Sequence, residues 1–289
     1  MSKDINDWVL DEWGTYMRWT ESELADSRDA LFKNGFIHIK NFLSKSYLQD
    51  LALAVDWVEQ HPSPFRIDKT DGINRFFMDF GNWRRSDLIK KLCLHQPLAE
   101  LTASLIRSKT LRLMHEDIII KNGTNDNATP PHQDQAYFIF GGDRNISAWM
   151  SLNDVPNNSS LLMYRGSHLS KQSYRPKRFD SGQDMYGDAD REESTYVATV
   201  LDEINIFEEV SFDYQVGDII LFFNKTLHAS RLNLIGAKRK SFVIRYLSDD
   251  AYIEDNPFAT VPPYELMGVN LSERNIIPEK FFPNILEEK

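Results

Sequence analysis

The chain of 289 residues has very little cysteine and no long apolar run. Cys93 is its only cysteine, which excludes an intramolecular disulfide and a thiolate metal cluster. No segment approaches the ~18 consecutive apolar residues of a membrane-spanning helix, and the first residues contain no apolar signal region. We therefore expect a cytoplasmic protein that has no membrane partner.

Positive charge is also scarce. The chain has 33 lysines and arginines against 43 acidic residues, a net charge of −10. This balance argues against a general nucleic-acid or anionic-membrane surface. We expect a small-molecule substrate, no nucleic-acid partner, and a monomer or a homodimer. The final residues, Leu286 to Lys289, are not a peroxisomal Ser-Lys-Leu address.

The first part of the chain is predicted to be mostly helical. Thr20 begins a helix with acids in its first turn, and Gly35 follows its expected end near Lys33. A short strand at 36–39 and a second helix from Ser44 come next. Residues 62–83 look irregular and rich in aromatics, and residues 86–108 look helical again.

From residue 111 onward the pattern becomes β. Short apolar segments separated by Gly, Asn and Asp turns predict a sandwich or jelly roll. The expected strands lie at 111–115 with 118–120, 146–153, 160–164, 209–214, 218–223 and 239–247. We expect one domain over 1–289, with a helical part at 1–110, a core at 111–247, a lid-like insertion at 169–205 and a tail at 248–289 packed on the core.

Two histidines and an aspartate form the strongest chemical signal. His132 and Asp134 are two residues apart, and on a strand such residues point to the same side. With His228 they could cap one face of an octahedral iron(II) and leave three positions open for a cosubstrate and oxygen. Taken alone, the His-x-Asp pair fits a surface turn better, and the ordered series of motifs makes the metal site the favoured interpretation.

Two arginines share one face of the last predicted strand. Arg239 and Arg245 alternate with outward-facing residues, so both point the same way as Ser241 and Val243. A buried guanidinium needs a partner, and its planar fork suits a carboxylate. The metal residues and this face together predict a 2-oxo acid cosubstrate. An internal acid such as Asp117 or Glu116 is an equal alternative partner for Arg245.

The order of these motifs resembles the phytanoyl-CoA dioxygenase family of iron(II)/2-oxoglutarate oxygenases over about 111–247. The resemblance implies a mainly β fold with flanking helices, whose core is a double-stranded β-helix, or cupin-like jelly roll. It rests on His132-Gln133-Asp134, Arg165-Gly166-Ser167-His168, Gly217-Asp218, His228-Ala229-Ser230, Asn233 and Arg239. Arg165 and Ala229 depart from the family's usual proline and glycine, and neither is a ligand position.

The resemblance also implies roles for single residues. Iron(II) would be held by His132, Asp134 and His228, with 2-oxoglutarate and O2 as cosubstrates. Arg239 would pair with the distal carboxylate of 2-oxoglutarate and Ser230 would hydrogen-bond it. Further cosubstrate contacts are expected from Trp149, Gln133 and Lys121, and substrate contacts from Arg245, Phe138 and Phe76. His168 is interpreted as a structural histidine that caps the Gly-Ser turn.

The retained Asp134 favours hydroxylation, because halogenating relatives carry a small residue at this position. We predict an enzyme that hydroxylates or otherwise oxidises an unactivated C–H bond of a small metabolite or natural-product intermediate, releasing succinate and CO2. The alternatives are an acyl-CoA 2-hydroxylase of the phytanoyl-CoA type, a non-catalytic jelly-roll binding protein, and a cupin-like metal enzyme without 2-oxoglutarate.

Overall fold

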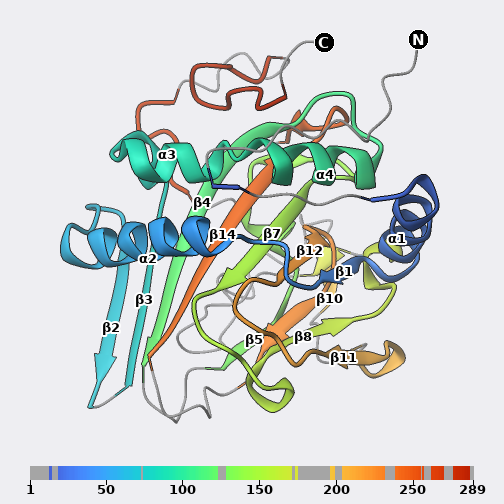
Figure 1. The fold of residues 1–289 in the computed structure, drawn as a ribbon, viewed down its shortest axis with the longest axis horizontal. Coiled ribbons are helices and arrows are strands. Elements are labelled where there is room, and N and C mark those ends of the chain that lie inside the picture. The colour runs from blue at the N-terminus through green and yellow to red at the C-terminus, as the bar shows by residue number, and fades with distance from the viewer. Residues whose placement is uncertain are drawn as a thin grey trace.

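The computed structural model describes residues 13–14, 19–72, 74–122, 128–170, 173–174, 196–198, 204–231, 238–254, 256, 262–269 and 276–286. Most of the expected lid-like insertion at 169–205 lies outside these residues. Within them, the chain forms a large and a small β-sheet with helices on one side (Figure 1).

The larger sheet has seven antiparallel strands. In spatial order they are β1 (Phe36–Ile39), β12 (Ile219–Phe223), β7 (Ile146–Ser151), β14 (Arg239–Leu247), β4 (Arg112–Asn122), β3 (Asn74–Phe80) and β2 (Ile67–Asp71). The smaller sheet has the order β11 (Glu209–Ser211), β8 (Leu161–Tyr164), β13 (His228–Ser230) and β5 (Thr129–His132). This arrangement confirms the predicted mainly β, jelly-roll fold class.

Two further pairs of strands are short. β6 (Phe140–Gly141) pairs with β15 (Tyr252–Ile253), and β9 (Ser173–Tyr174) pairs with β10 (Tyr196–Ala198). The β6–β15 pair connects the segment that follows Asp134 to the segment that follows β14.

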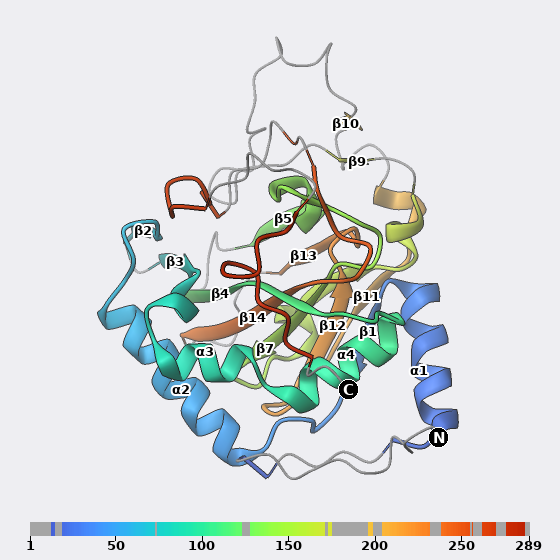
Figure 2. The same ribbon diagram turned by 90° about the horizontal axis from the view of Figure 1, so that it is seen from above.

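Helices cover the outer face of the larger sheet. They are α1 (Glu21–Asn34), α2 (Lys45–Gln60), α3 (Asp87–Cys93) and α4 (Gln96–Ile106). Figure 2 shows α2, α3 and α4 on one side of β4, β14 and β7, with β13 and β5 on the other. No helix in the described ranges is both long and apolar enough to cross a membrane.

Alternation along the strands divides the interior into two parts. Phe242 and Ile244 of β14 point outward and pack with the helices in the main apolar cluster. Val243 points inward and packs with Trp149 and Phe222 toward the smaller sheet. Because side chains alternate along a strand, each residue of β14 is assigned either to the helix-covered core or to the space between the sheets.

The first helix has the boundaries that the sequence predicts. The Thr20 hydroxyl accepts from the Glu23 amide at 3.2 Å, and the Glu23 carboxylate accepts from the Thr20 amide at 2.8 Å. This capping box satisfies free amides at the helix start. Gly35 ends the helix at φ 89°, and a Cβ there would lie 2.5 Å from His168 Nδ1.

One expectation for the N-terminal part was wrong and another was confirmed. Residues 62–83, expected to be irregular, contain the β2–β3 hairpin, which extends the larger sheet beyond β4. Residues 86–108, expected to be helical, form α3 and α4, which confirms this expectation. Pro97 lies in the first turn of α4, where it lacks an amide to donate and favours a new helix start.

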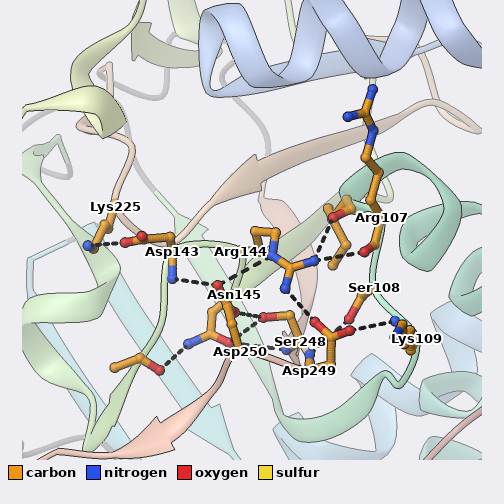
Figure 3. Close-up of polar contacts among 12 residues, drawn as sticks. Arg107, Ser108, Lys109, Asp143, Arg144, Asn145, Lys225, Ser248, Asp249 and Asp250 are labelled. Carbon is orange, nitrogen blue, oxygen red and sulfur yellow. Dashed lines mark hydrogen bonds and ion pairs between the residues drawn. The ribbon is translucent and has the colours of Figure 1, made fainter.

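Arg144 ties the end of α4 to the turn after β14 (Figure 3). Its guanidinium donates to the carbonyls of Ile106 at 3.3 Å and Arg107 at 2.7 Å, and it pairs with Asp249 at 2.5 Å and Asp250 at 3.3 Å. The Arg144 side chain is 25% exposed. This partly solvated cluster stabilises the edge of the fold away from the space between the sheets.

Candidate metal centre

The three predicted metal residues meet on the inner side of the smaller sheet. His132 ends β5 and His228 begins β13, and the two residues pair across these strands. Asp134 begins the 3₁₀ helix η2 (Asp134–Tyr137) instead of continuing β5. The expected His-x-Asp strand is therefore wrong, and a tight turn after His132 brings the carboxylate to the imidazoles.

The geometry of the three side chains fits a facial metal site. One possible ligand atom from each of the three lies within 4.8 Å of the others. The Nε2 atoms of His132 and His228 lie 3.4 and 3.6 Å from Asp134 Oδ1. Two imidazole nitrogens and one carboxylate oxygen are the donor set of the non-haem iron facial triad.

Backbone carbonyls fix the tautomer of both histidines. His132 Nδ1 donates to the carbonyl of Pro130 at 2.8 Å, and His228 Nδ1 donates to that of Thr226 at 3.0 Å. Since each Nδ1 donates to a carbonyl, each Nε2 is the ring nitrogen that faces Asp134. Such outer hydrogen bonds orient the ligands of metal sites.

The charge states also suit a divalent cation. Burial lowers the pKa of His228 to about 3, so its imidazole is neutral near pH 7. Burial opposes ionisation of Asp134, but the positive charge of Arg245 holds the pKa of this carboxyl below its ordinary value. The site thus offers a neutral His228 imidazole and an ionised carboxylate, which are the forms that bind metal.

The predicted face of β14 lines a cavity between the sheets. Arg239, Ser241, Val243 and Arg245 all line it, and water-sized spheres can occupy about 70 Å³ of it. The larger sheet also contributes Phe76, Met78, Ile119, Lys121, Trp149 and Phe222, and the segments around the smaller sheet contribute Thr129, His132, Asp134, Leu161, His228, Ala229 and Ser230.

One end of this cavity is cationic. Lys121 and Arg239 pair in register across β4 and β14, and both are buried. Lys121 Nζ donates to the hydroxyls of Ser230 and Thr129, each at 2.6 Å. Arg239 donates to the carbonyl of Ser159 at 2.6 Å, and none of the described carboxylates pairs with it.

Burial is costly for both cations. It lowers the pKa of Arg239 to about 10, and together with the charge of Arg239 it lowers the pKa of Lys121 well below the ordinary lysine value. Two buried positive groups side by side favour an anionic ligand.

The cationic end of the cavity lies close to the predicted metal residues. Ser230 follows His228 by two residues on β13, a separation of roughly 7 Å along a strand. This separation is comparable to the length of an extended five-carbon dicarboxylate. A ligand that chelates a metal at His228 could therefore place its far carboxylate beside Ser230, Lys121 and Arg239.

The other end of the β14 face is neutralised by the protein itself. Arg245 Nε donates to Asp117 Oδ2 at 2.7 Å, and Nη1 contacts Asp134 Oδ2 and Ser147 Oγ. The alternative expectation of an internal acid for Arg245 is thus what the structure contains, with Asp117 and Asp134 as the acids. Arg245 also lines the cavity, and its contact with a substrate stays a prediction.

Other sequence-predicted residues divide between the cavity and its surroundings. Phe76 and Trp149 line it. Gln133 is outside the lining, because its amide donates to the Lys225 carbonyl and accepts from the Tyr174 amide. Phe138 is also outside it and packs in a third apolar cluster with its ring beside the Arg245 guanidinium. His168 contacts the carbonyl of Phe32 at 2.9 Å, away from the metal residues.

Sequence reasoning missed four polar residues around this site: Thr129, Ser147, His115 and Tyr264. Strand parity could have identified His115, which shares its side of β4 with Asp117 and Lys121. Ser147 also shares its side of β7 with Trp149, so the same argument could have identified it. No local signal marks Thr129 or Tyr264, since each is placed by contacts with residues distant in sequence.

The comparisons with known proteins agree with this geometry. The sequence profile of phytanoyl-CoA dioxygenase (PhyH) matches residues 31–241. A comparison with curated protein sequences finds no match.

Solved structures share the fold at low sequence identity. The non-heme alpha ketoglutarate dependent epimerase SnoN from nogalamycin biosynthesis is 19% identical, with a TM-score of 0.71, over 92% of this chain and 100% of that one. The carbocyclase SnoK from the same biosynthesis is 18% identical, with a TM-score of 0.68, over 90% and 96%. EctD from S. alaskensis, with 2-oxoglutarate and 5-hydroxyectoine, is 18% identical, with a TM-score of 0.64, over 86% and 85%.

Proposed function

Because the chain belongs to the phytanoyl-CoA dioxygenase family, we propose that its inter-sheet cavity hydroxylates an unactivated C–H bond of a small metabolite or natural-product intermediate. The chain is an iron- and 2-oxoglutarate-dependent oxygenase. The observation that carries the proposal is the pairing of a facial His-Asp-His set with a buried cationic pocket about one dicarboxylate length away.

We propose that His132, Asp134 and His228 hold iron(II), and that Arg239, Ser230 and Lys121 bind the distal carboxylate of 2-oxoglutarate. The planar fork of Arg239 suits a carboxylate, and this carboxylate would compensate the burial of both cations. Trp149 lies on β7 between the two arginines of the β14 face and would flank the cosubstrate.

When bound, iron supplies the activation of O2, which converts the substrate R–H, 2-oxoglutarate and O2 into R–OH, succinate and CO2. The protein contributes position and exclusion of water. The histidines and Asp134 leave one face of the metal site open, and Arg239 orients the 2-oxo acid toward it. Ile119, Val243 and Phe222 line the cavity with apolar surface, which keeps bulk water from the reacting atoms.

The cavity favours a small substrate. Water-sized spheres can occupy only about 70 Å³ of it, which is little for a ligand as large as a long-chain acyl-CoA. Among similar structures, SnoN and SnoK come from nogalamycin biosynthesis and the EctD structure contains 5-hydroxyectoine. These likenesses support small organic molecules over a long-chain acyl-CoA.

A turnover assay with purified protein tests the proposal. Iron(II), 2-oxoglutarate, O2 and a panel of small metabolites and acyl-CoA esters would be supplied, and succinate and the oxidised product would be quantified. We expect succinate formation that requires iron and is lost in His132→Ala, while Arg144→Gln, outside the cavity, retains it. Metal-independent succinate formation, or oxidation of acyl-CoA esters only, would contradict the proposal.

A further inference from the structure

Arg245 touches the free oxygen of the proposed metal-binding carboxylate. From this contact we infer that Arg245 is a positioning residue that keeps Asp134 a single-oxygen ligand, and that Asp117, His115 and Tyr264 hold Arg245 in place for this purpose. The inference rests on the proposed function, because it presupposes that Asp134 binds the metal.

The two oxygens of Asp134 have different surroundings. Oδ1 lies 3.4 Å from His132 Nε2 and 3.6 Å from His228 Nε2, so it faces the position that a metal would share with the imidazoles. Oδ2 is in direct contact with Arg245 Nη1. A carboxylate oxygen that accepts from a guanidinium is turned away from the metal, which leaves Oδ1 as the ligand.

Single-oxygen binding matters for the proposed chemistry. Two histidines and one carboxylate oxygen leave three octahedral positions free, which accommodates a chelating 2-oxo acid and O2. If both oxygens of Asp134 bound the metal, only two positions would stay free. The 2-oxo acid would then fill both, and no position would be left for O2.

The Arg245 guanidinium is held by three groups. Its Nε donates to Asp117 Oδ2 at 2.7 Å, and Nη1 donates to Ser147 Oγ at 2.7 Å in addition to Asp134. Arg245 and both carboxylates have side chains less than 8% exposed. Side chains fixed by several hydrogen bonds in a buried site can impose a geometry on the group that they contact.

Asp117 has polar neighbours on its far side. Its Oδ1 lies 3.3 Å from His115 Nε2, and His115 Nδ1 is 2.9 Å from the hydroxyl of Tyr264. His115 and Asp117 come from β4, whereas Tyr264 belongs to the described segment 262–269 beyond β15. A buried polar series therefore connects the C-terminal part of the chain to the metal residues.

The decisive variant is Arg245→Lys, which keeps the positive charge but cannot contact Asp117, Ser147 and Asp134 together. Co(II) serves as the probe, and its affinity and visible absorption spectrum are measured without turnover. We expect a ~10–100-fold weaker Co(II) affinity, the usual effect of removing an outer partner of a metal ligand. We also expect an altered spectrum and a crystal structure of the Co(II) form in which both Asp134 oxygens approach the metal.

Arg144→Lys is the matched control. Arg144 also pairs with two carboxylates, Asp249 and Asp250, but it lies outside the cavity lining. We expect its Co(II) affinity and spectrum to equal those of the wild type. Asp117→Asn is the second test variant: it is similar in size to the original side chain, loses the charge that anchors Arg245, and decides the question if Arg245→Lys does not fold.

The outcomes separate the two proposals. If the wild type binds no Co(II), or if His132→Ala binds it equally well, the proposed metal site fails and the inference fails with it. If wild-type binding is normal and depends on His132, but Arg245→Lys or Asp117→Asn leaves affinity, spectrum and single-oxygen binding unchanged, only the inference is overturned. A weaker affinity with both oxygens of Asp134 on the metal supports it.

Discussion

Arg239 and Arg245 lie six residues apart on the same face of β14, and both are buried, yet their surroundings are opposite. Two carboxylates of the protein surround Arg245, and they raise its pKa although burial opposes this. Arg239 donates to a backbone carbonyl, none of the described carboxylates pairs with it, and burial lowers its pKa to about 10.

The different surroundings of the two arginines indicate different roles. A buried cation whose charge is balanced by the protein is a structural part of the apo molecule, and its removal leaves other charges uncompensated. A buried cation that lacks a protein carboxylate is a site that an external anion can complete. We therefore assign Arg245 to the organisation of the metal centre and Arg239 to the proposed cosubstrate.

The largest expected contrast is in the stability of the apo protein. Arg245→Met should lower the free energy of unfolding by about 3–5 kcal/mol, because it leaves Asp117 and Asp134 buried without a cation. Arg239→Met should change it by less than about 1 kcal/mol, since removal of a costly buried charge offsets one lost hydrogen bond. Urea unfolding of metal-free protein measures both, and equal losses would remove the distinction between the two arginines.

The contrast should reverse when 2-oxoglutarate binding is measured. Arg239→Met should weaken binding by about 2–5 kcal/mol, the usual cost of truncating one partner of a buried charge pair. Calorimetric titration of the metal-loaded protein gives this value, with Arg144→Met as the control. Normal affinity in Arg239→Met would place the distal carboxylate elsewhere in the cavity.

An internal carboxylate should make the cationic end resemble the surroundings of Arg245. Ser230→Asp puts an acid beside Lys121, whose Nζ lies 2.6 Å from the present hydroxyl. The new charged hydrogen bond should stabilise the apo protein by about 1–3 kcal/mol and compete with 2-oxoglutarate. Thermal unfolding with and without 2-oxoglutarate tests this. Ser230→Asn adds no charge, so both the stabilisation and the competition with 2-oxoglutarate should be smaller in this variant.

The smallest expected effect is a pH dependence of cosubstrate binding. Burial and the charge of Arg239 lower the pKa of Lys121 in the apo protein, and a bound carboxylate should raise it again. Between these two pKa values binding takes up protons, so the affinity for 2-oxoglutarate should fall as the pH rises through that window. Calorimetry in buffers of different ionisation enthalpy measures the uptake, which Lys121→Met should abolish.

Local patterns predicted much of this architecture. The capping sequence at Thr20 fixed the first helix, and strand parity placed Arg239, Ser241, Val243 and Arg245 on one side of β14. The β2–β3 hairpin was not predicted. Asp71-Gly72 is a turn signal that could have indicated it, and Gly72 has φ 58° at the turn, but the flanking residues lack a regular alternation of apolar side chains. Its strand status depends on pairing with β4, which is a tertiary contact.

The metal residues were also predicted, although their local structure was not. The sequence expectation put Asp134 on a strand with His132, and the structure puts it in a 3₁₀ turn. A strand and a turn can both direct these side chains to one point, so the predicted metal site does not depend on the strand assignment of Asp134. Gln133 and Phe138, predicted from the same motif, have their side chains engaged outside the cavity lining.

By itself, the sequence determined the donor set and the presence of two arginines on one inward face, because residue identity and alternation along a strand are local properties. The choice of a jelly roll over another β sandwich came from the family resemblance. Only the tertiary structure decided which arginine pairs with carboxylates of the protein and which is available to a ligand. The acids that neutralise Arg245 lie 128 and 111 residues away in sequence. Their distances to the guanidinium depend on how β4, β5 and β14 come together, and no local pattern contains that information.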